Sequence, residues 1–242
     1  MNALSLTLFS CLTAGLLAQE PGKDSKPAPA AADKPVQTKV LQLGQRMNGQ
    51  TTLTDIDGVP VKAHDLMGKV TVVNFWSTQC PIQKAWDQRL AQIQKDFEGQ
   101  GVVFLHIDSN VTEIGEAPQK AEGDKKPYAN IRDHLKEKGL PFRVLVDHGN
   151  KVADFMGANT TPHIYVFAAD GKLVYKGLVD DDQKDKNADK RQNYLRDVLG
   201  KLTKNEKVEP SETKEQGCTI KRVKVAAPAP APAGDGAKKS GS

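Results

Sequence analysis

Between residues 39 and 203 the chain alternates short apolar runs with stretches in which apolar residues recur every three or four positions. The run 70–76 is nearly continuous, as is typical of a strand that is covered on both faces. Pro81 then opens a stretch with apolar residues at helical spacing. These residues are Ile82, Trp86, Leu90, Ile93 and Phe97. The pattern predicts a buried strand followed directly by an amphipathic helix.

The same alternation continues towards the middle of the chain. A second apolar run at 102–107 predicts another strand. The stretch 128–138 predicts a helix, with Gly139 and Pro141 as its stop signals. A short apolar run at 142–146 predicts the next strand, so that strands and helices follow one another in turn.

The last part of this region predicts a hairpin and a closing helix. Two runs, 163–168 and 172–178, flank Asp170-Gly171, a dipeptide that favours a tight turn between strands. Residues 188–202 have the spacing of an amphipathic helix. Strands that alternate with helices and end in a hairpin predict an α/β domain, with a mixed central sheet and helices on both faces.

The two ends of the chain lack this pattern. Residues 1–18 form a short apolar stretch that ends in small residues, which predicts a signal peptide and export to the periplasm or the cell exterior. Residues 19–38 are rich in Pro, Ala and Lys and predict a linker before the domain at 39–203. Residues 204–242 predict a flexible tail that contains Cys218. We expect no integral membrane segment after signal cleavage.

Charge and composition narrow the set of partners. The formal net charge is +4, and basic residues are interleaved with acidic ones. Lys221, Arg222 and Lys224 have no neighbouring aromatic residues on which bases could stack, so we expect no nucleic-acid partner. The histidines are scattered and the cysteines lie far apart, which argues against a metal site. Phosphate-binding and haem-attachment motifs are absent from the sequence, so we expect no cofactor.

Cys80 follows the first predicted strand and directly precedes Pro81. We therefore expect it in the first turn of the helix, where free backbone N–H groups and the helix dipole stabilise a thiolate. There the pKa of a cysteine can fall from about 8.5 to between roughly 3.5 and 7.5. Cys80 is the candidate nucleophile, and the alternative is a small buried apolar residue. His106 and Asp108, at the end of the next strand, are candidates to lie nearby.

The residues 72–81, Val-Val-Asn-Phe-Trp-Ser-Thr-Gln-Cys-Pro, resemble the active-site approach of exported thioredoxin-like proteins and of the AhpC/TSA redoxins. Thioredoxin-like relatives continue as Cys-Pro-x-Cys, whereas this chain has Gln83 at the second cysteine position. Downstream, Thr161-Pro162 is similar to the cis-proline loop of the family. The resemblance implies that this loop packs against Cys80. It also implies that the residue before the proline offers backbone hydrogen bonds to a bound thiol substrate.

A peroxiredoxin-like subgroup of these redoxins resembles the chain over residues 65–221. The resemblance rests on three further segments, 141–147, 171–177 and 212–221. It implies the thioredoxin fold and a thiol-dependent oxidoreductase activity. True peroxiredoxins carry Pro-x-x-x-Thr-x-x-Cys, and at those offsets this chain has Val73 and Ser77. The hydroxyls of Ser77 and the adjacent Thr78 are therefore candidates for substrate binding.

Cys218 lies in the last of these segments and is the candidate resolving cysteine. In this hypothesis Cys80 attacks a peroxide or a disulfide and becomes a sulfenic acid or a mixed disulfide. The Cys218 thiolate then displaces the attached group. A flexible tail could bring Cys218 to the site without distorting the domain. The alternative is an incidental cysteine in a disordered tail.

The sequence therefore predicts an exported, thiol-dependent oxidoreductase, and two reactions remain open. One is the reduction of a hydroperoxide, and the other is thiol–disulfide exchange with a protein partner. A function of another class is also open: a redox-inactive, thioredoxin-like binding module in which Cys80 is structural. The replacement of the second cysteine by Gln83 is the main argument for that module.

Overall fold

The strand β3 (Thr71–Trp76) forms the centre of the sheet, and each of its residues is buried. The computed structural model describes residues 39–224 of the chain. β3 pairs in parallel with β4 (Val103–Asp108) and antiparallel with β7 (His163–Phe167). The prediction of a strand covered on both faces at 70–76 is therefore confirmed.

The described residues contain one mixed sheet with the strand order β2-β1-β5-β4-β3-β7-β8-β9. The remaining strands of this sheet are β1 (Thr52–Asp55), β2 (Pro60–Lys62), β5 (Val144–Val146), β8 (Leu173–Gly177) and β9 (Ser211–Glu212). β3, β4 and β5 are parallel, whereas β1 and β7 run antiparallel to their partners. Two short strands, β6 (Thr160–Thr161) and β10 (Cys218–Thr219), form a separate antiparallel pair.

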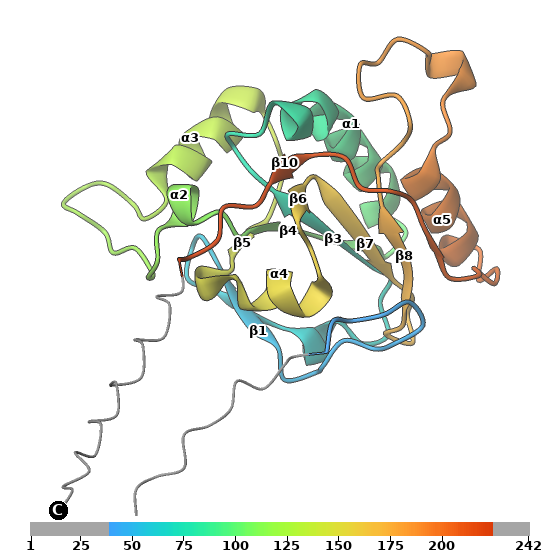
Figure 1. Ribbon diagram of the computed structural model, residues 1–242, viewed down its shortest axis with the longest axis horizontal. Coiled ribbons are helices and arrows are strands. Elements are labelled where there is room, and N and C mark those ends of the chain that lie inside the picture. Colours follow the sequence, from blue (N-terminus) through green and yellow to red (C-terminus); the bar gives the residue numbers. More distant parts are fainter. Residues whose placement is uncertain (1–38, 225–242) are drawn as a thin grey trace, which may run out of the picture. The chain divides into compact units, whose positions relative to one another are not determined.

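Helices cover both faces of the sheet (Figure 1). They are α1 (Pro81–Glu98), α2 (Val111–Ile114), α3 (Ala129–Lys138), α4 (Lys151–Met156) and α5 (Tyr194–Thr203), with 3-10 turns η1 (Ala63–Leu66), η2 (His148–Asn150) and η3 (Ala188–Lys190). Val72 and Trp76 of β3 belong to one apolar cluster with α1, α3 and α5. Val73 and Phe75 belong to a second cluster with α4. The α/β thioredoxin fold predicted from the sequence is confirmed.

Two predicted helices differ in extent from those observed. α3 begins one residue after the start of the predicted stretch 128–138 and ends at Lys138, and the φ of 61° at the following Gly139 is left-handed. The helix predicted at 188–202 is divided into η3 and α5 because the backbone is extended at Arg191. The guanidinium of Arg191 forms a salt bridge with Asp182, which holds this break against the preceding loop.

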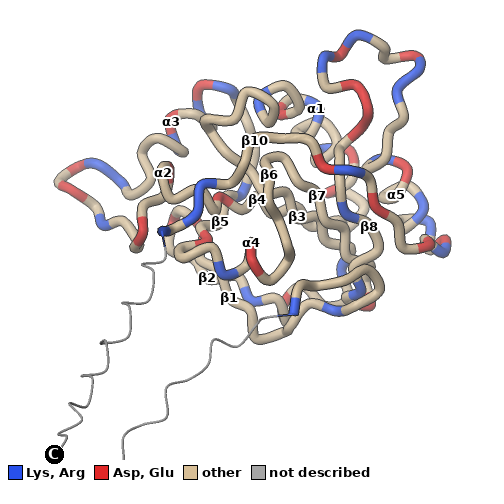
Figure 2. Tube along the Cα trace, in the orientation of Figure 1, with Lys and Arg blue, Asp and Glu red and all other residues tan. Residues whose placement is uncertain are grey.

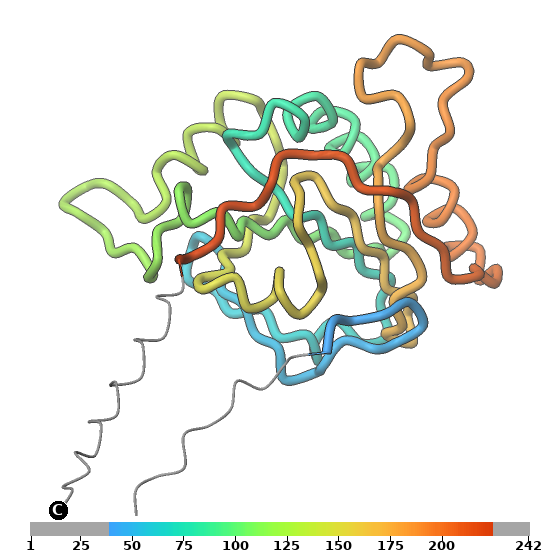
Figure 3. The backbone as a smooth tube through the Cα atoms, viewed as in Figure 1, coloured from blue at the N-terminus to red at the C-terminus, as the bar shows by residue number. Residues whose placement is uncertain are grey.

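The segment 204–224 is docked on the domain, so the prediction of a flexible tail is wrong for this part of the chain (Figure 3). We call residues 211–223 the strap. Within it β9 pairs with β8, β10 pairs with β6, and Ile220 is buried in the cluster that contains α4. The strap is held largely by backbone hydrogen bonds. A composition rich in Lys and Glu does not reveal such contacts.

The remaining predictions on the chain ends fall elsewhere. The signal peptide predicted at 1–18, the linker predicted at 19–38 and the tail beyond residue 224 lie outside the described residues. Among the described helices, none combines the length and the apolar character needed to cross a membrane.

Candidate active site

Cys80 is the N-cap residue of α1, with Pro81 at the first helical position. The expectation that Cys80 lies inside the first turn is therefore corrected by one residue. Pro81 takes that position because its ring fixes a helical φ and its missing N–H would have no partner there. The Sγ of Cys80 accepts a hydrogen bond from the backbone N–H of Gln83 at 3.3 Å. Free N–H groups at a helix start stabilise negative charge, so this position suits a thiolate.

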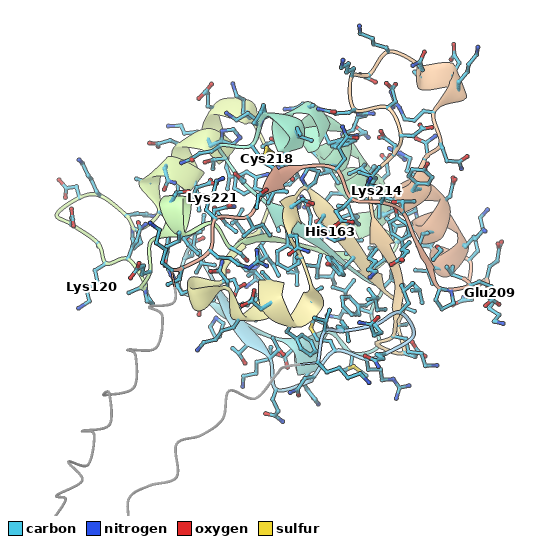
Figure 4. The ribbon with its side chains drawn as sticks, in the orientation of Figure 1. Lys120, His163, Glu209, Lys214, Cys218 and Lys221 are labelled. Carbon is cyan, nitrogen blue, oxygen red and sulfur yellow. A yellow bond between two sulfur atoms is a disulfide. The ribbon has the colours of Figure 1, made fainter. Side chains whose placement is uncertain are left out.

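A disulfide joins Cys80 to Cys218, which is 138 positions further along the chain. The two Cα atoms lie 5.8 Å apart, within the range that a disulfide requires. Cys80 is only 2% exposed, whereas Cys218 is half-buried. Figure 4 labels Cys218 on the strap. The fold thus brings the two candidate thiols into a covalent bond, and Cys218 is the more exposed of the two residues.

The loop at Thr161-Pro162 lies directly against this bond. The peptide bond between the two residues is cis, and the carbonyl oxygen of Thr161 is 2.9 Å from the Sγ of Cys80. Cys218 lies opposite Thr161 in the antiparallel pair of β10 and β6. The structure therefore gathers the predicted residues Cys80, Cys218, Thr161 and Pro162 at one place.

Ser77 and Thr78 form the turn that leads into Cys80. The Oγ of Ser77 accepts hydrogen bonds from the backbone N–H groups of Gln79 and Cys80, each at 3.1 Å. Both hydroxyls donate to the carboxylate of Glu113, which also accepts the backbone N–H of Thr78 at 2.7 Å. The two side chains are buried, and their hydroxyls hold the turn before Cys80 in place.

Glu113 is the one residue of this cluster that the sequence analysis missed. It lies on α2, directly after β4, and its carboxylate is buried beside that of Asp108. Burial raises the pKa of Asp108 well above its usual value, and the neighbouring Glu113 raises it further. Both effects favour the protonated form of the Asp108 carboxyl. The useful signal was topological: β3 and β4 are parallel neighbours, so residues that follow them meet at one edge of the sheet.

Gln83 occupies the position of the second cysteine of thioredoxin-like relatives. Its side chain is fully buried and links two elements of the core. The amide nitrogen donates to Asp87 at 2.9 Å, and the amide oxygen accepts from Asn74 of β3 at 3.3 Å. Burial raises the pKa of Asp87, although the hydrogen bonds from Gln83 and Trp76 oppose this shift. The position therefore serves the packing of α1 on the sheet.

Two histidines near the site are buried and uncharged at neutral pH. His106 lies between Asn74 and Gln94 and stacks on Phe142, and burial lowers its pKa to about 3. His163 directly follows Pro162, and burial lowers its pKa to about 4. The contacts of His106 are thus those of a core residue.

The surroundings of the disulfide carry no strong charge of one sign. Along the strap, acidic and basic residues alternate before Cys218, and Lys221 and Arg222 follow it (Figure 2). Within residues 39–224, no three His, Cys, Asp or Glu side chains gather in a way that could hold a metal ion.

The family of the chain follows from its sequence. The model of the AhpC/TSA family matches residues 44–176, which is more than half of the 242 residues. The chain belongs to the AhpC/TSA family. The resemblance proposed from the residues around Cys80 is confirmed at the level of the family.

Among curated relatives, the AhpC/TSA chain is similar to proteins named thiol-disulfide oxidoreductase ResA. That of Bacillus anthracis is 26% identical over 123 residues, which cover 50% of this chain and 62% of the relative. That of Bacillus subtilis (strain 168) is 25% identical over 122 residues, which cover 50% of this chain and 60% of the relative. The similarity thus spans less than two thirds of the length of either relative.

Two solved structures share the fold over most of this AhpC/TSA chain. An uncharacterized conserved protein from Geobacillus kaustophilus is 28% identical, with a TM-score of 0.63, and the match covers 79% of this chain and 97% of that one. A hypothetical protein from Sinorhizobium meliloti 1021 is 24% identical, with a TM-score of 0.62 and coverage of 77% and 98%. These structures support the fold and carry no named activity.

Proposed function

We propose that the protein is a thiol–disulfide oxidoreductase in which Cys80 is the nucleophile and Cys218 is the resolving cysteine. One observation carries the proposal: the bond between Cys80 and Cys218 beside the Thr161-Pro162 loop. The names of the ResA relatives support the same class of reaction. The second thiol, which is missing at the position of Gln83, is provided by Cys218 on the strap. This argues against a redox-inactive binding module.

The first step is an attack on a disulfide of the protein partner. The Cys80 thiolate, held at the start of α1 with the N–H of Gln83 at its sulfur, bonds to one partner sulfur. The partner disulfide breaks, and its other sulfur leaves as a thiolate that takes a proton from water. The product is a mixed disulfide between Cys80 and the partner.

The second step resolves this mixed disulfide. The thiolate of Cys218 attacks the Sγ of Cys80, the bond from Cys80 to the partner breaks, and the partner sulfur leaves as a thiolate. Two thiols of the protein have then been oxidised to the Cys80–Cys218 disulfide. The partner disulfide has been reduced by the same two electrons. A dithiol reductant reverses the change in the protein and completes the cycle.

Reduction of a hydroperoxide is the second candidate, and membership of the AhpC/TSA family favours it. In that reaction Cys80 takes one oxygen and becomes a sulfenic acid, the alcohol leaves, and Cys218 condenses with the sulfenic acid to release water. We rank disulfide exchange first because the hydroxyls of Ser77 and Thr78 donate to Glu113 and are not offered to a peroxide.

We further propose that the reaction takes place after export, in the periplasm or outside the cell. The apolar stretch at residues 1–18 supports a signal peptide. A disulfide between the two cysteines of the domain is suited to an oxidising compartment.

The test is a single turnover of the fully reduced protein with a disulfide-bonded peptide, in the absence of other thiols. The wild-type protein should release one equivalent of reduced peptide. Cys80→Ser should release none, and Cys218→Ser should stop at the mixed disulfide. Thr219→Ser, at the exposed neighbour of Cys218, should react as the wild type does. Release of peptide by Cys80→Ser at the wild-type rate would refute the proposal. A parallel assay with hydrogen peroxide separates the two substrate classes.

A further inference from the structure

The strap is attached to the domain on both sides of Cys218. Upstream, Thr213 donates its N–H to the carbonyl of Lys176 at 3.1 Å, and its Oγ1 accepts the N–H of Leu178 at 2.9 Å. Downstream, Ile220 donates its N–H to the carbonyl of Asn159 at 2.9 Å, and its side chain is buried. Cys218 lies on the short segment between these two attachments, which crosses β6. Because both ends of this segment are fixed, Cys218 is held near Cys80.

The upstream attachment requires a glycine beneath it. Gly177 of β8 has a φ of 140°, and a β-carbon there would lie 2.7 Å from the carbonyl oxygen of Thr213. The backbone of the strap therefore approaches that of β8 more closely than any side chain would allow. The attachment of Thr213 to β8 is therefore part of the native fold.

A second glycine lies at the reacting end, directly before Cys218. A β-carbon added at Gly217 would overlap the carbonyl oxygen of Thr161 and would lie 2.7 Å from its carbonyl carbon. Thr161 cannot yield easily, because its carbonyl oxygen is also packed against the Sγ of Cys80. The surface beside Cys80 thus accepts an extended strand with a cysteine only when glycine precedes that cysteine.

Because Cys80 is nearly enclosed, a partner sulfur that bonds to it must take the place now held by the sulfur of Cys218. Disulfide geometry then requires the Cα atom of the partner cysteine to lie about 4.4–6.8 Å from the Cα atom of Cys80. A partner strand that pairs with β6 as β10 does places the residue before its cysteine over the carbonyl of Thr161, where Gly217 lies.

We propose that the strap is a template for the partner: the partner strand binds to β6 in the same way as the strap, and the two exchange places there. This proposal rests on the function proposed above. The partner presents an extended strand in which a glycine precedes the reactive cysteine. When Cys218 attacks Cys80, the Cys80–partner bond breaks and the Cys80–Cys218 bond forms. Cys218 and Thr219 then pair with β6 again and displace the partner strand. Resolution and product release are therefore one event.

The partner preference is tested with two peptides that have the strap sequence 215–221 and carry a small thiol in disulfide linkage on their cysteine. One peptide keeps glycine before the cysteine, and the other has alanine. The reduced Cys218→Ser protein should form a mixed disulfide at least about tenfold faster with the glycine peptide, a factor equal to about 1.4 kcal/mol. Equal rates with the two peptides would contradict the proposal that the partner strand binds as the strap does. Failure to react with both peptides and with a small-molecule disulfide would instead refute the function of Cys80.

The exchange on β6 is tested with Gly217→Ala, which weakens strap pairing and keeps both cysteines. After reaction with the glycine peptide, its mixed disulfide should persist about tenfold longer than that of the wild type. Lys214→Ala, at an exposed strap position outside β10, is the control and should resolve at the wild-type rate. An unchanged rate of attack of Gly217→Ala on a small-molecule disulfide shows that the site is folded. Resolution by Gly217→Ala at the wild-type rate would overturn the proposal.

Discussion

The carboxylate of Glu113 accepts hydrogen bonds from both the backbone N–H and the hydroxyl of Thr78, two residues before Cys80. The same carboxylate accepts a hydrogen bond from the hydroxyl of Ser77, and the oxygen of that hydroxyl accepts a hydrogen bond from the N–H of Cys80. The buried side chain of Glu113 on α2 therefore fixes the turn that positions Cys80. Because all three groups are donors, their partner must be an acceptor.

Glu113→Gln should weaken this turn, because an amide NH₂ would face donors where a carboxylate oxygen now accepts. We expect a loss of about 1–3 kcal/mol in the free energy of unfolding, measured with urea on the reduced protein. The attack of Cys80 on a small-molecule disulfide should slow as well. Glu116→Gln, at an exposed position nearby, is the control and should change neither quantity. Unchanged stability and reactivity of Glu113→Gln would show that Glu113 does not support the site.

Asp108 should make stability fall as pH rises. Its pKa is raised in the folded state, so above about pH 4 the unfolded chain releases a proton that the folded protein retains. This contribution lowers the free energy of unfolding from about pH 4 up to the raised folded pKa. Asp108→Asn should remove it, so the variant should gain stability relative to the wild type as pH rises. Unfolding curves from pH 4 to 8 measure this, and parallel profiles would contradict it.

Ile220→Ala should make the Cys80–Cys218 disulfide easier to reduce. The disulfide keeps the strap near its docked position, whereas the reduced strap can leave once its buried anchor is lost. The reduction potential should therefore become less negative, by about 30 mV for each 1.4 kcal/mol of lost docking. Equilibration with glutathione buffers measures it, with Thr219→Ala as control. An unchanged potential would show that the strap stays docked after reduction.

Reduction of the disulfide should begin at Cys218. Cys218 is the more exposed residue, and Cys80 is the better leaving group because its thiolate is held at the start of α1. A limiting bulky monothiol, followed by rapid alkylation and peptide mapping, should place the thiol adduct on Cys218 and the alkyl label on Cys80. The opposite distribution would contradict the geometry.

Local patterns in the sequence were sufficient for the central part of the fold. The continuous run at 70–76 predicted β3, and Pro81 predicted the start of α1, because each signal depends on residues adjacent in the chain. The hairpin at Asp170-Gly171 followed for the same reason, and the left-handed φ of 81° at Gly171 shows why glycine is needed there.

The rest of the site depends on contacts that no local pattern displays. Glu113 reaches Ser77 across 36 positions of sequence, and only the pairing of β3 with β4 brings them together. The strap was predicted to be flexible because most of its side chains are polar, yet backbone hydrogen bonds and the buried side chain of Ile220 attach it to the domain. The positions of Gly217 and Gly177 matter through close backbone contacts, which composition cannot reveal.

The most direct test of the account follows both cysteines during a single turnover. Fully reduced protein is mixed with one equivalent of a disulfide-bonded peptide, quenched with acid at successive times, and mapped under non-reducing conditions. The account predicts that a transient Cys80–peptide disulfide appears first. The Cys80–Cys218 disulfide should then form at the rate at which reduced peptide is released. Release of reduced peptide while Cys80 and Cys218 both remain thiols would contradict the central claim.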